Sequence, residues 1–384
     1  MNIHLPLPLL GDISPTDFMQ HYWQKKPLLI RQAIPGFQPL LSRTELLQLA
    51  EQEDVESRLV VQKTEATSAA PAQQWTFRHG PFTRKSLPPF KQAGWTILVQ
   101  GVDMLHEGVH SLLQQFRFVP DARLDDLMIS FATDGGGVGP HFDSYDVFLL
   151  QAQGRRRWRI GPQTDLSLQP DMPLKILANF VPEQEFVLEP GDMLYLPPRY
   201  AHDGVAQGEC MTYSVGFRTP AKEELAREIL QRLAEPAGED AAPVLYQDPQ
   251  QVAVAASGAM PAGLLQFSVE AVQAALQDPQ AIARALGEYL TEPKAQVWFE
   301  GGDEACAPAN FQSIALNRKT RMLFDAHHIF INGESFLASG QDAALMQTMA
   351  NARCLSAADA LRLSAPAREI LTQWCEDGWA SYVE

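Results

Sequence analysis

The first 120 residues alternate between short helical and strand-like hydrophobic runs. Ser14 is a plausible N-cap before Pro15, and the pattern predicts a short helix to about Trp23, ended by Pro27. A second capped helix is predicted over residues 42–52. Runs of β-branched and aromatic residues bounded by turn residues predict strands in four places: 28–31, 57–62, 74–80 and 95–101.

Beyond Leu124 the strand signals become dense. Strand-like runs separated by turns containing Gly or Pro occur at 125–133, 145–154, 155–161, 185–198 and 210–218. Many short strands with this punctuation are typical of a β-sandwich or barrel. The sequence therefore predicts a jelly-roll domain.

After Pro220 the hydrophobic spacing becomes helical. It is helical in 221–236 and again in 268–293, and the two segments are separated by a stretch rich in Ala, Gly and Pro. Further on, Asn332-Gly333 between strand-like runs predicts a hairpin. Helical segments follow it at 340–353 and 356–364. This combination favours a small winged-helix-like module at the end of the chain.

Charge and cysteine usage narrow the possible functions. A formal net charge of -16 argues against a nonspecific binder of nucleic acid or anionic membranes, and it suits a basic protein partner. The four scattered cysteines form no CxxC pair, which argues against a disulfide framework or structural zinc and fits the cytoplasm. No signal peptide or membrane span is expected from the pattern.

A glycine-rich turn at 135–139 leads directly into a His-x-Asp pair, His141 and Asp143. On a strand, residues two apart share a face. His202, which follows a strand stopped by prolines, could complete a set of two histidines and one carboxylate. This is the facial triad of non-haem Fe(II) oxygenases, which leaves open positions for a 2-oxo acid and O2. For an isolated His-x-Asp pair, a turn-capping role is the commoner explanation.

The strand at 155–161 adds a second feature. Arg156 and Trp158 share one face, and the other arginines of this strand share the opposite face. An arginine that points into the barrel needs an anionic partner, which the distal carboxylate of 2-oxoglutarate could provide. The alternative is that these arginines are solvated, which suits Arg155, Arg157 and Arg159.

The preceding strand supplies three more candidates on one face. Ser130 could donate a hydrogen bond to the same carboxylate, and Asp126 could receive a cationic substrate side chain. Met128 could form an apolar wall for that side chain, or it could simply be a core residue.

Three other motifs carry weaker signals. The HEGVH segment at 106–110 matches the HExxH zinc-protease signature, but no convincing third ligand follows, so we expect its histidines to flank an ordinary helix. The GGGVG segment lacks the Lys-Ser/Thr of a phosphate-binding loop. The histidine pair at 327–328 has no cysteine or acidic cluster beside it.

Taken together, these motifs resemble the JmjC-domain, 2-oxoglutarate-dependent oxygenases, which are cupin-like proteins, and in particular their bacterial ribosomal oxygenases. The segments that carry the resemblance lie between residues 15 and 218: YWQKKPLLI, DDLMISFATDGGGVGPHFDSYDVF, GRRRWRIG, EPGDMLYLPPRYAHDG and YSVGFR.

The resemblance implies a JmjC double-stranded β-helix catalytic domain at 1–220, a helical dimerisation region at 221–295 and a winged-helix-like domain at 296–384. It implies Fe(II) ligands at His141, Asp143 and His202, a 2-oxoglutarate site at Arg156 and Ser130, and O2 as oxidant. The expected activity is hydroxylation of an arginine in a basic ribosomal protein of the large subunit, by a cytoplasmic homodimer.

With that target, Asp126 would hold the guanidinium, and Tyr145 would stack on it. Two alternatives remain open. The same chemistry could act on another residue, as histidine hydroxylation or demethylation. A cupin sensor with a DNA-binding winged helix is a non-enzymatic alternative, although the acidic charge argues against direct DNA binding.

Overall fold

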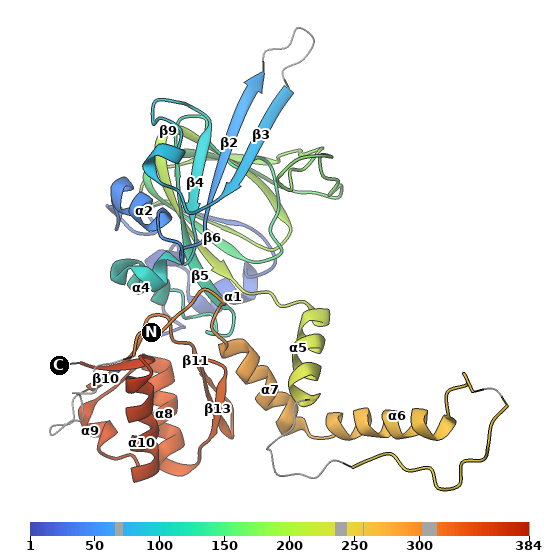
Figure 1. Ribbon diagram of the computed structural model, residues 1–384. Coiled ribbons are helices and arrows are strands. Elements are labelled where there is room, and N and C mark those ends of the chain that lie inside the picture. Colours follow the sequence, from blue (N-terminus) through green and yellow to red (C-terminus); the bar gives the residue numbers. More distant parts are fainter. Residues whose placement is uncertain (66–71, 235–243, 256, 302–312, 384) are drawn as a thin grey trace. The chain divides into compact units, whose positions relative to one another are not determined.

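A computed structural model of the chain describes residues 1–65, 72–234, 244–255, 257–301 and 313–383. The chain forms two compact units, Met1–Thr219 and Pro220–Glu384, and each is described by itself (Figure 1). No helix among the described residues has both the length and the apolar character needed to cross a membrane.

The first unit combines short N-terminal helices with nine strands. Its elements in chain order are η1 (Pro8–Leu10), α1 (Pro15–His21), β1 (Leu28–Ile30), α2 (Arg43–Ala50), β2 (Ser57–Glu65), β3 (Ala72–His79), η2 (Arg84–Ser86), β4 (Trp95–Val99), α3 (Val102–Leu105), α4 (Glu107–Gln114), β5 (Leu124–Ala132), β6 (Val147–Pro162), β7 (Gln184–Leu188), β8 (Met193–Leu196) and β9 (Tyr200–Phe217). The two predicted N-caps are confirmed, since the hydroxyls of Ser14 and Ser42 each accept a backbone N–H of the helix that follows.

The strands form one antiparallel sheet with the order β1-β8-β6-β9-β5-β4-β2-β3, and β7 pairs with β6. The predicted runs at 145–154 and 155–161 join into the single long strand β6. The first half of β6 pairs with β8 and its second half with β7, while β9 runs alongside both halves. This arrangement agrees with the predicted jelly-roll, a double-stranded β-helix.

The two faces of the curled sheet bury different apolar sets. Leu59 and Phe148 belong to the large core that also contains buried residues of α1, α2 and α4, which pack beside the strands (Figure 1). Their neighbours Val60 and Leu149 belong to separate, smaller clusters. The curled sheet forms a cup, and the face packed against the helices is its outer face. Because side chains alternate along a strand, the smaller clusters lie on the opposite, inner face of the cup.

The second unit contains helices followed by a winged-helix-like fold. Its elements are α5 (Lys222–Ala234), α6 (Ala262–Leu276), α7 (Pro279–Thr291), β10 (Ser313–Leu316), β11 (Met322–Phe324), β12 (His328–Ile331), β13 (Glu334–Leu337), α8 (Gly340–Ala352), β14 (Cys354–Leu355), α9 (Ala357–Ala360), α10 (Ala365–Glu376) and β15 (Ala380–Val383). The predicted hairpin is confirmed, because Asn332 and Gly333 connect β12 and β13 with φ angles of 47° and 92°.

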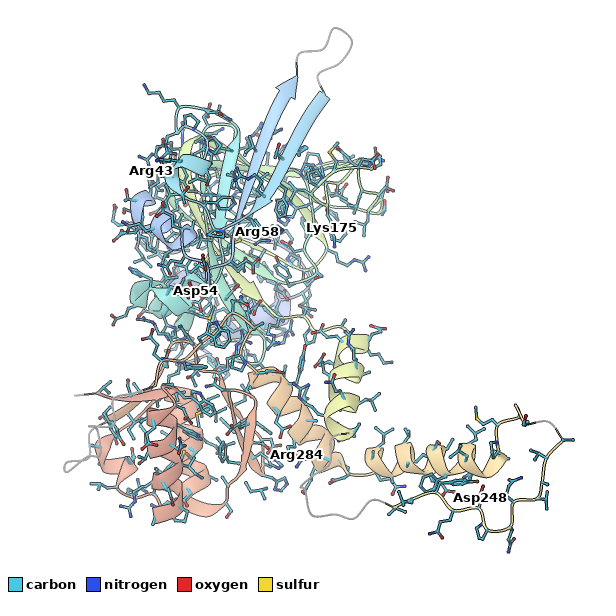
Figure 2. The ribbon with its side chains drawn as sticks, in the orientation of Figure 1. Arg43, Asp54, Arg58, Lys175, Asp248 and Arg284 are labelled. Atoms are coloured by element: carbon cyan, nitrogen blue, oxygen red, sulfur yellow. The ribbon has the colours of Figure 1, made fainter. Side chains whose placement is uncertain are left out.

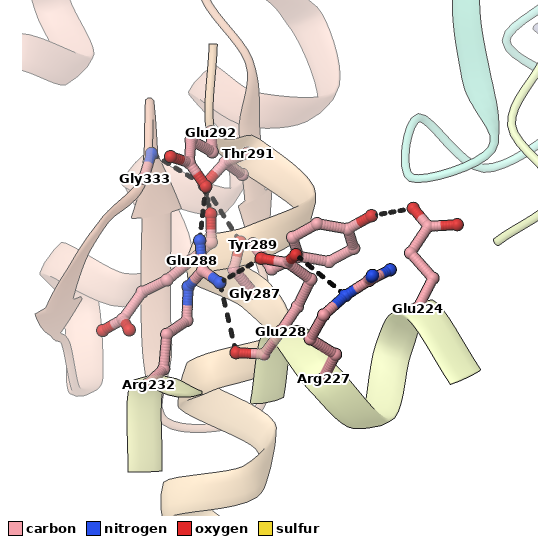
Figure 3. A network of polar contacts seen from close by, with 10 residues as sticks. All are labelled: Glu224, Arg227, Glu228, Arg232, Gly287, Glu288, Tyr289, Thr291, Glu292 and Gly333. Carbon is pink, nitrogen blue, oxygen red and sulfur yellow. Dashed lines mark hydrogen bonds and ion pairs between the residues drawn. The ribbon is translucent and has the colours of Figure 1, made fainter. Parts of the chain in front are cut away.

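Polar contacts join α5 to α7, and α7 to the β12–β13 hairpin (Figure 3). Arg232 of α5 pairs with Glu292, next to the end of α7. Glu288 of α7 accepts a hydrogen bond from the Ser335 hydroxyl at 2.6 Å, and the Gly333 N–H donates to the Thr291 hydroxyl at 3.1 Å. Helix α7 therefore connects helix α5 to the winged-helix-like fold of this unit.

The pattern at 268–293 predicted helix without a break, but the structure contains two helices. Helix α6 ends at Leu276, and α7 begins at Pro279 with the Asp278 side chain as its N-cap. Proline is favoured at a helix start and cannot continue a preceding helix. Residues 235–243, which begin the stretch rich in Ala, Gly and Pro, lie outside the described residues, and so does Cys306.

Candidate metal centre

Three sequence-predicted residues converge on the inner face of the cup. His141, Asp143 and His202 each offer one ligand atom, and these atoms all lie within 4.8 Å of one another. Nε2 of His202 lies 3.6 Å from Oδ2 of Asp143. In the described part of the chain, no other group of three His, Cys, Asp or Glu side chains converges in this way.

His141 and Asp143 were expected to converge by alternation along a strand, but backbone hydrogen bonds to the start of β9 bring them together instead. The regular strand expected through His141 and Asp143 is not formed, and His141 makes only an isolated bridge to His202. Their backbones exchange two hydrogen bonds, of 3.0 and 2.8 Å. The Asp143 carbonyl accepts the Arg199 N–H at 2.7 Å, which fixes Asp143 beside the start of β9.

Glycines allow the segment before His141 to lie close to β9. A Cβ atom added at Gly137 would come within 2.6 Å of the Gly204 carbonyl oxygen. One added at Gly204 would meet the Trp158 ring at the same distance. The glycine-rich turn is therefore required for close backbone approach at the site.

Backbone carbonyls orient both imidazoles. Nδ1 of His141 lies 2.8 Å from the Gly139 carbonyl oxygen, and Nδ1 of His202 lies 3.0 Å from that of Tyr200. Because a carbonyl can only accept, each Nδ1–H donates to it, and each Nε2 atom is the one directed to the metal position. Burial, together with the nearby His141, lowers the pKa of His202 to about 4. His202 is therefore neutral at pH 7, as a metal ligand must be.

Arg156 points into the cup, as the alternation predicted. Its side chain is 4% exposed, and neither Nε nor Nη2 has a hydrogen-bond acceptor. The guanidinium lies beside the Trp158 ring, with its carbon 5.7 Å from the ring centroid. The outward arginines differ, since Arg159 pairs with Asp203 at 2.6 Å and Arg157 lies 3.9 Å from Glu185. A buried cation without an acceptor suits an anionic ligand.

Ser130 is buried on the inner face, but its hydroxyl already has a partner. It lies 3.4 Å from the Thr212 carbonyl oxygen of the neighbouring strand β9. Thr212 in turn donates to Gln151 at 3.0 Å. The Ser130 hydroxyl would have to rotate away from this carbonyl to donate to a bound carboxylate.

The three candidate substrate residues lie near one another. The buried Asp126 accepts a hydrogen bond from the side chain of Gln100 at 2.8 Å. The thioether of Met128 lies 3.4 Å from Nη2 of Arg58. Tyr145 is 39% exposed in a bend after Asp143 rather than on a regular strand face. The ring is partly exposed, but burial of the hydroxyl group raises the pKa of Tyr145, and the charges of Asp143 and Asp126 add to the rise.

The sequence pattern did not identify Gln100 or Arg58 as part of this group. Gln100 follows β4 directly, and Arg58 lies on β2. Both residue types are common on exposed strands, so only the pairing of β2, β4 and β5 could have placed them beside Asp126.

The HExxH match is not a metal site in this fold. His106 precedes α4 and caps it, because its Nδ1 accepts the Val109 N–H at 3.4 Å. The two histidines are therefore not two ligands on one helix face. Val109, Leu112 and Leu113 of this helix are buried.

Two family models match the chain, and together they cover more than half of it. A JmjC domain matches residues 111–225, and a ROXA-like winged helix matches residues 274–381. The ribosomal protein uL16 3-hydroxylase of Escherichia coli K12 is 42% identical over 223 residues, which are 56% of this chain and 57% of that protein.

A probable ribosomal oxygenase of Haemophilus influenzae is 38% identical over 54% of this chain and 50% of its own length. The matched region thus spans about half the length of these curated relatives. Solved structures match more widely. YcfD, a ribosomal oxygenase from Escherichia coli, covers 96% of this chain with a TM-score of 0.78 and 28% identity, over 98% of its own length. Another YcfD structure contains cobalt and 2-oxoglutarate, with a TM-score of 0.77 and 29% identity.

Proposed function

Because the chain belongs to the JmjC-domain ribosomal oxygenases, we propose that it is an Fe(II)- and 2-oxoglutarate-dependent hydroxylase of a ribosomal protein. The observation that carries the proposal is the pairing of two features on one inner face: the convergent His141, Asp143 and His202, and the buried Arg156 without an acceptor. Neither a structural core nor a solvated surface accounts for both.

The residues present fit the metal and the co-substrate. Two imidazole nitrogens and one carboxylate oxygen are the donor set of mononuclear Fe(II) oxygenases. Arg156 would receive the distal carboxylate of 2-oxoglutarate, and its planar guanidinium can bind a carboxylate through two hydrogen bonds. The cobalt and 2-oxoglutarate bound by YcfD support this assignment. Ser130 is proposed as a second hydrogen-bonding group for the same carboxylate.

When bound, the metal and co-substrate would supply the oxidising chemistry, in which O2 converts 2-oxoglutarate to succinate and CO2 and inserts one oxygen atom into a C–H bond. The chain provides placement and seclusion. The two histidines hold their Nε2 atoms toward one point. Arg156 fixes the far end of the co-substrate and so sets its orientation.

We propose an arginine of uL16, a large-subunit ribosomal protein, as the target. The activity in the name of the Escherichia coli relative supports uL16, and the choice of arginine rests on the residues of the cup. The buried carboxylate of Asp126 suits a guanidinium, and the Tyr145 ring and Met128 thioether can contact its flat faces. A basic target also suits a chain with a net charge of -16. With a ribosomal protein as the target, we propose that the reaction takes place in the cytoplasm.

The second unit is proposed to form a homodimer through its helices. Helix α6 has no buried residue, yet it exposes a stripe of large apolar side chains: Leu264, Leu265, Val269, Val272 and Leu276. Such a stripe is expected to be covered in solution. We propose helical dimerisation over 221–295 and a winged-helix-like domain over 296–384. Direct DNA binding is not expected, because the chain has a formal net charge of -16.

The proposal is tested by following 2-oxoglutarate turnover with the purified protein. Succinate formation is expected to require Fe(II) and to rise when recombinant uL16 is added. A second basic ribosomal protein serves as the control for charge alone. No stimulation by uL16, or equal stimulation by the control protein, would contradict the proposed target.

A further inference from the structure

The pairing of three strands places a second layer of residues behind the proposed substrate carboxylate. In the antiparallel register, Arg58 of β2 lies opposite Leu98 of β4, and Leu98 lies opposite Ser130 of β5. Residues paired in this way share a face, as do residues two apart along one strand. Arg58 and Gln100 therefore lie on the inner face that also carries Asp126, and Figure 2 shows Arg58 among the strands of this unit.

Hydrogen bonds connect these residues in a chain. Nη2 of Arg58 donates to Oε1 of Gln100 at 2.6 Å, and Nε2 of Gln100 donates to Oδ2 of Asp126 at 2.8 Å. Asp126 is 3% exposed, whereas the Arg58 side chain is 31% exposed and lies 3.8 Å from Glu56. The chain of bonds thus runs from a partly solvated cation to a buried carboxylate.

The donor-to-acceptor direction of these two hydrogen bonds depends on Arg58. A glutamine amide can present either its oxygen or its NH2 group in a given direction. Arg58 can only donate, so it requires the Gln100 oxygen, and this leaves the Gln100 NH2 group for the carboxylate. Without Arg58, Gln100 could rotate and present its oxygen to Asp126, which would be repulsive. The Met128 thioether, 3.4 Å from the same Nη2, also contacts the guanidinium.

We propose that Gln100 and Arg58 are positioning residues that fix the Asp126 carboxylate for a cationic side chain of the protein substrate. This inference rests on the proposed function, since it takes Asp126 as the substrate carboxylate. Gln100 holds the carboxylate directly, and Arg58 acts through Gln100. A positioned carboxylate can bind a guanidinium without first losing rotational freedom, so the benefit is realised in substrate affinity.

The test measures the affinity of recombinant uL16 for the protein loaded with Mn(II) and 2-oxoglutarate. Arg58→Met and Gln100→Leu are each expected to weaken uL16 binding roughly tenfold, the effect of one charge-assisted hydrogen bond. The losses of uL16 affinity are not expected to add in the double variant, because both changes break the same series of hydrogen bonds. The double variant should bind uL16 about as well as the single variant with the lower affinity. Arg58→Lys keeps a donor and is expected to restore part of the affinity.

Arg78→Met is the matched charge control, because Arg78 is an exposed arginine on the neighbouring strand β3. Removing a positive charge from the protein generally favours a basic partner. The control is therefore expected to bind uL16 with equal or greater affinity. Arg58→Met removes the same charge but is expected to bind uL16 with lower affinity. Affinity for Mn(II) and 2-oxoglutarate reports whether each variant is folded.

Two results would overturn the inference: unchanged or tighter uL16 binding by Arg58→Met, or fully additive losses in the double variant. Asp126→Asn separates this failure from that of the proposed function. If Asp126→Asn weakens binding while Arg58→Met does not, only the positioning role is wrong. If Asp126→Asn leaves uL16 affinity unchanged, the proposed substrate carboxylate is wrong as well.

Discussion

His141 and His202 face each other across one pair of backbone hydrogen bonds, with their ring centroids 4.3 Å apart. The two residues are far apart in sequence, and each imidazole is also held by a carbonyl near its own residue. The chain therefore orients two imidazole ligands before any metal binds. This preorganisation is the basis of the first prediction.

Loss of a residue that only hydrogen-bonds to a metal ligand reduces metal affinity by roughly 10- to 100-fold. Replacing His202, a ligand itself, with alanine is expected to reduce Fe(II) affinity by more than this. Anaerobic calorimetry with Fe(II) would measure the change. His110→Ala, in the HEGVH segment, is the control and is expected to bind the metal as the wild type does. Reduced metal stoichiometry in His110→Ala would mean that the segment takes part in metal binding.

Replacing Arg156 with methionine is expected to have opposite effects on stability and on co-substrate binding. Without 2-oxoglutarate, the change removes a buried cation that has no acceptor, so the free energy of unfolding should rise by about 1–4 kcal/mol. Affinity for 2-oxoglutarate should fall by roughly 100-fold, because two charge-assisted hydrogen bonds are lost. Urea denaturation and calorimetry measure the two quantities.

Arg157→Met is the control for this prediction, because Arg157 lies on the opposite face of β6, and it should change neither quantity substantially. A destabilised apo-protein in Arg156→Met, with unchanged 2-oxoglutarate affinity, would assign Arg156 a structural role instead.

The depressed pKa of His202 predicts a pH dependence of stability. In the unfolded chain His202 takes up a proton near pH 6.5, whereas in the folded protein burial and His141 lower its pKa to about 4. As the pH falls from 6.5 toward 4, the unfolded state binds a proton that the folded state does not. The metal-free protein should therefore lose up to about 1.4 kcal/mol per pH unit through this residue.

Denaturation of the metal-free wild type and of His202→Asn between pH 4 and pH 7 isolates this contribution, since all other groups are shared. The difference in stability between the two proteins should shrink steadily below pH 6.5. Parallel stability curves over this range would show that His202 does not titrate as described.

The apolar stripe of α6 predicts that one charge will disrupt the proposed dimer. Val272 is 56% exposed within the chain, so Val272→Glu should leave the fold intact and convert a dimer into a monomer. Gln273→Glu adds the same charge to the next residue, on the polar side of the helix, and should leave the dimer unchanged. Light scattering after size-exclusion chromatography measures the mass. A monomeric wild type would contradict the proposal.

Sequence patterns predicted many elements of both units, because these elements depend on local signals. Caps such as Ser14 and Ser42, and turns such as Asn332-Gly333, act over a few residues and are visible in one sequence. The inward direction of Arg156 followed from the two-residue period of a strand. The break between α6 and α7 was missed because the apolar spacing continues past Pro279.

The site was predictable in its residues but not in its geometry. His141 and Asp143 were expected on a regular strand, yet their positions depend on the His202 backbone and on the Arg199 N–H. Gln100 joins the site only because β4 pairs with β5. Such contacts depend on strand register between distant segments, which no local pattern specifies.

The chain is proposed to insert one oxygen atom into an arginine of uL16. This proposal is tested most directly by peptide-level mass spectrometry of uL16 after incubation with the protein, Fe(II), 2-oxoglutarate and O2. The account predicts a mass increase of one oxygen atom on a single arginine, absent when 2-oxoglutarate is omitted and absent with His141→Ala. An unmodified uL16 under conditions of active turnover, or an oxygen atom on another residue type, would contradict it.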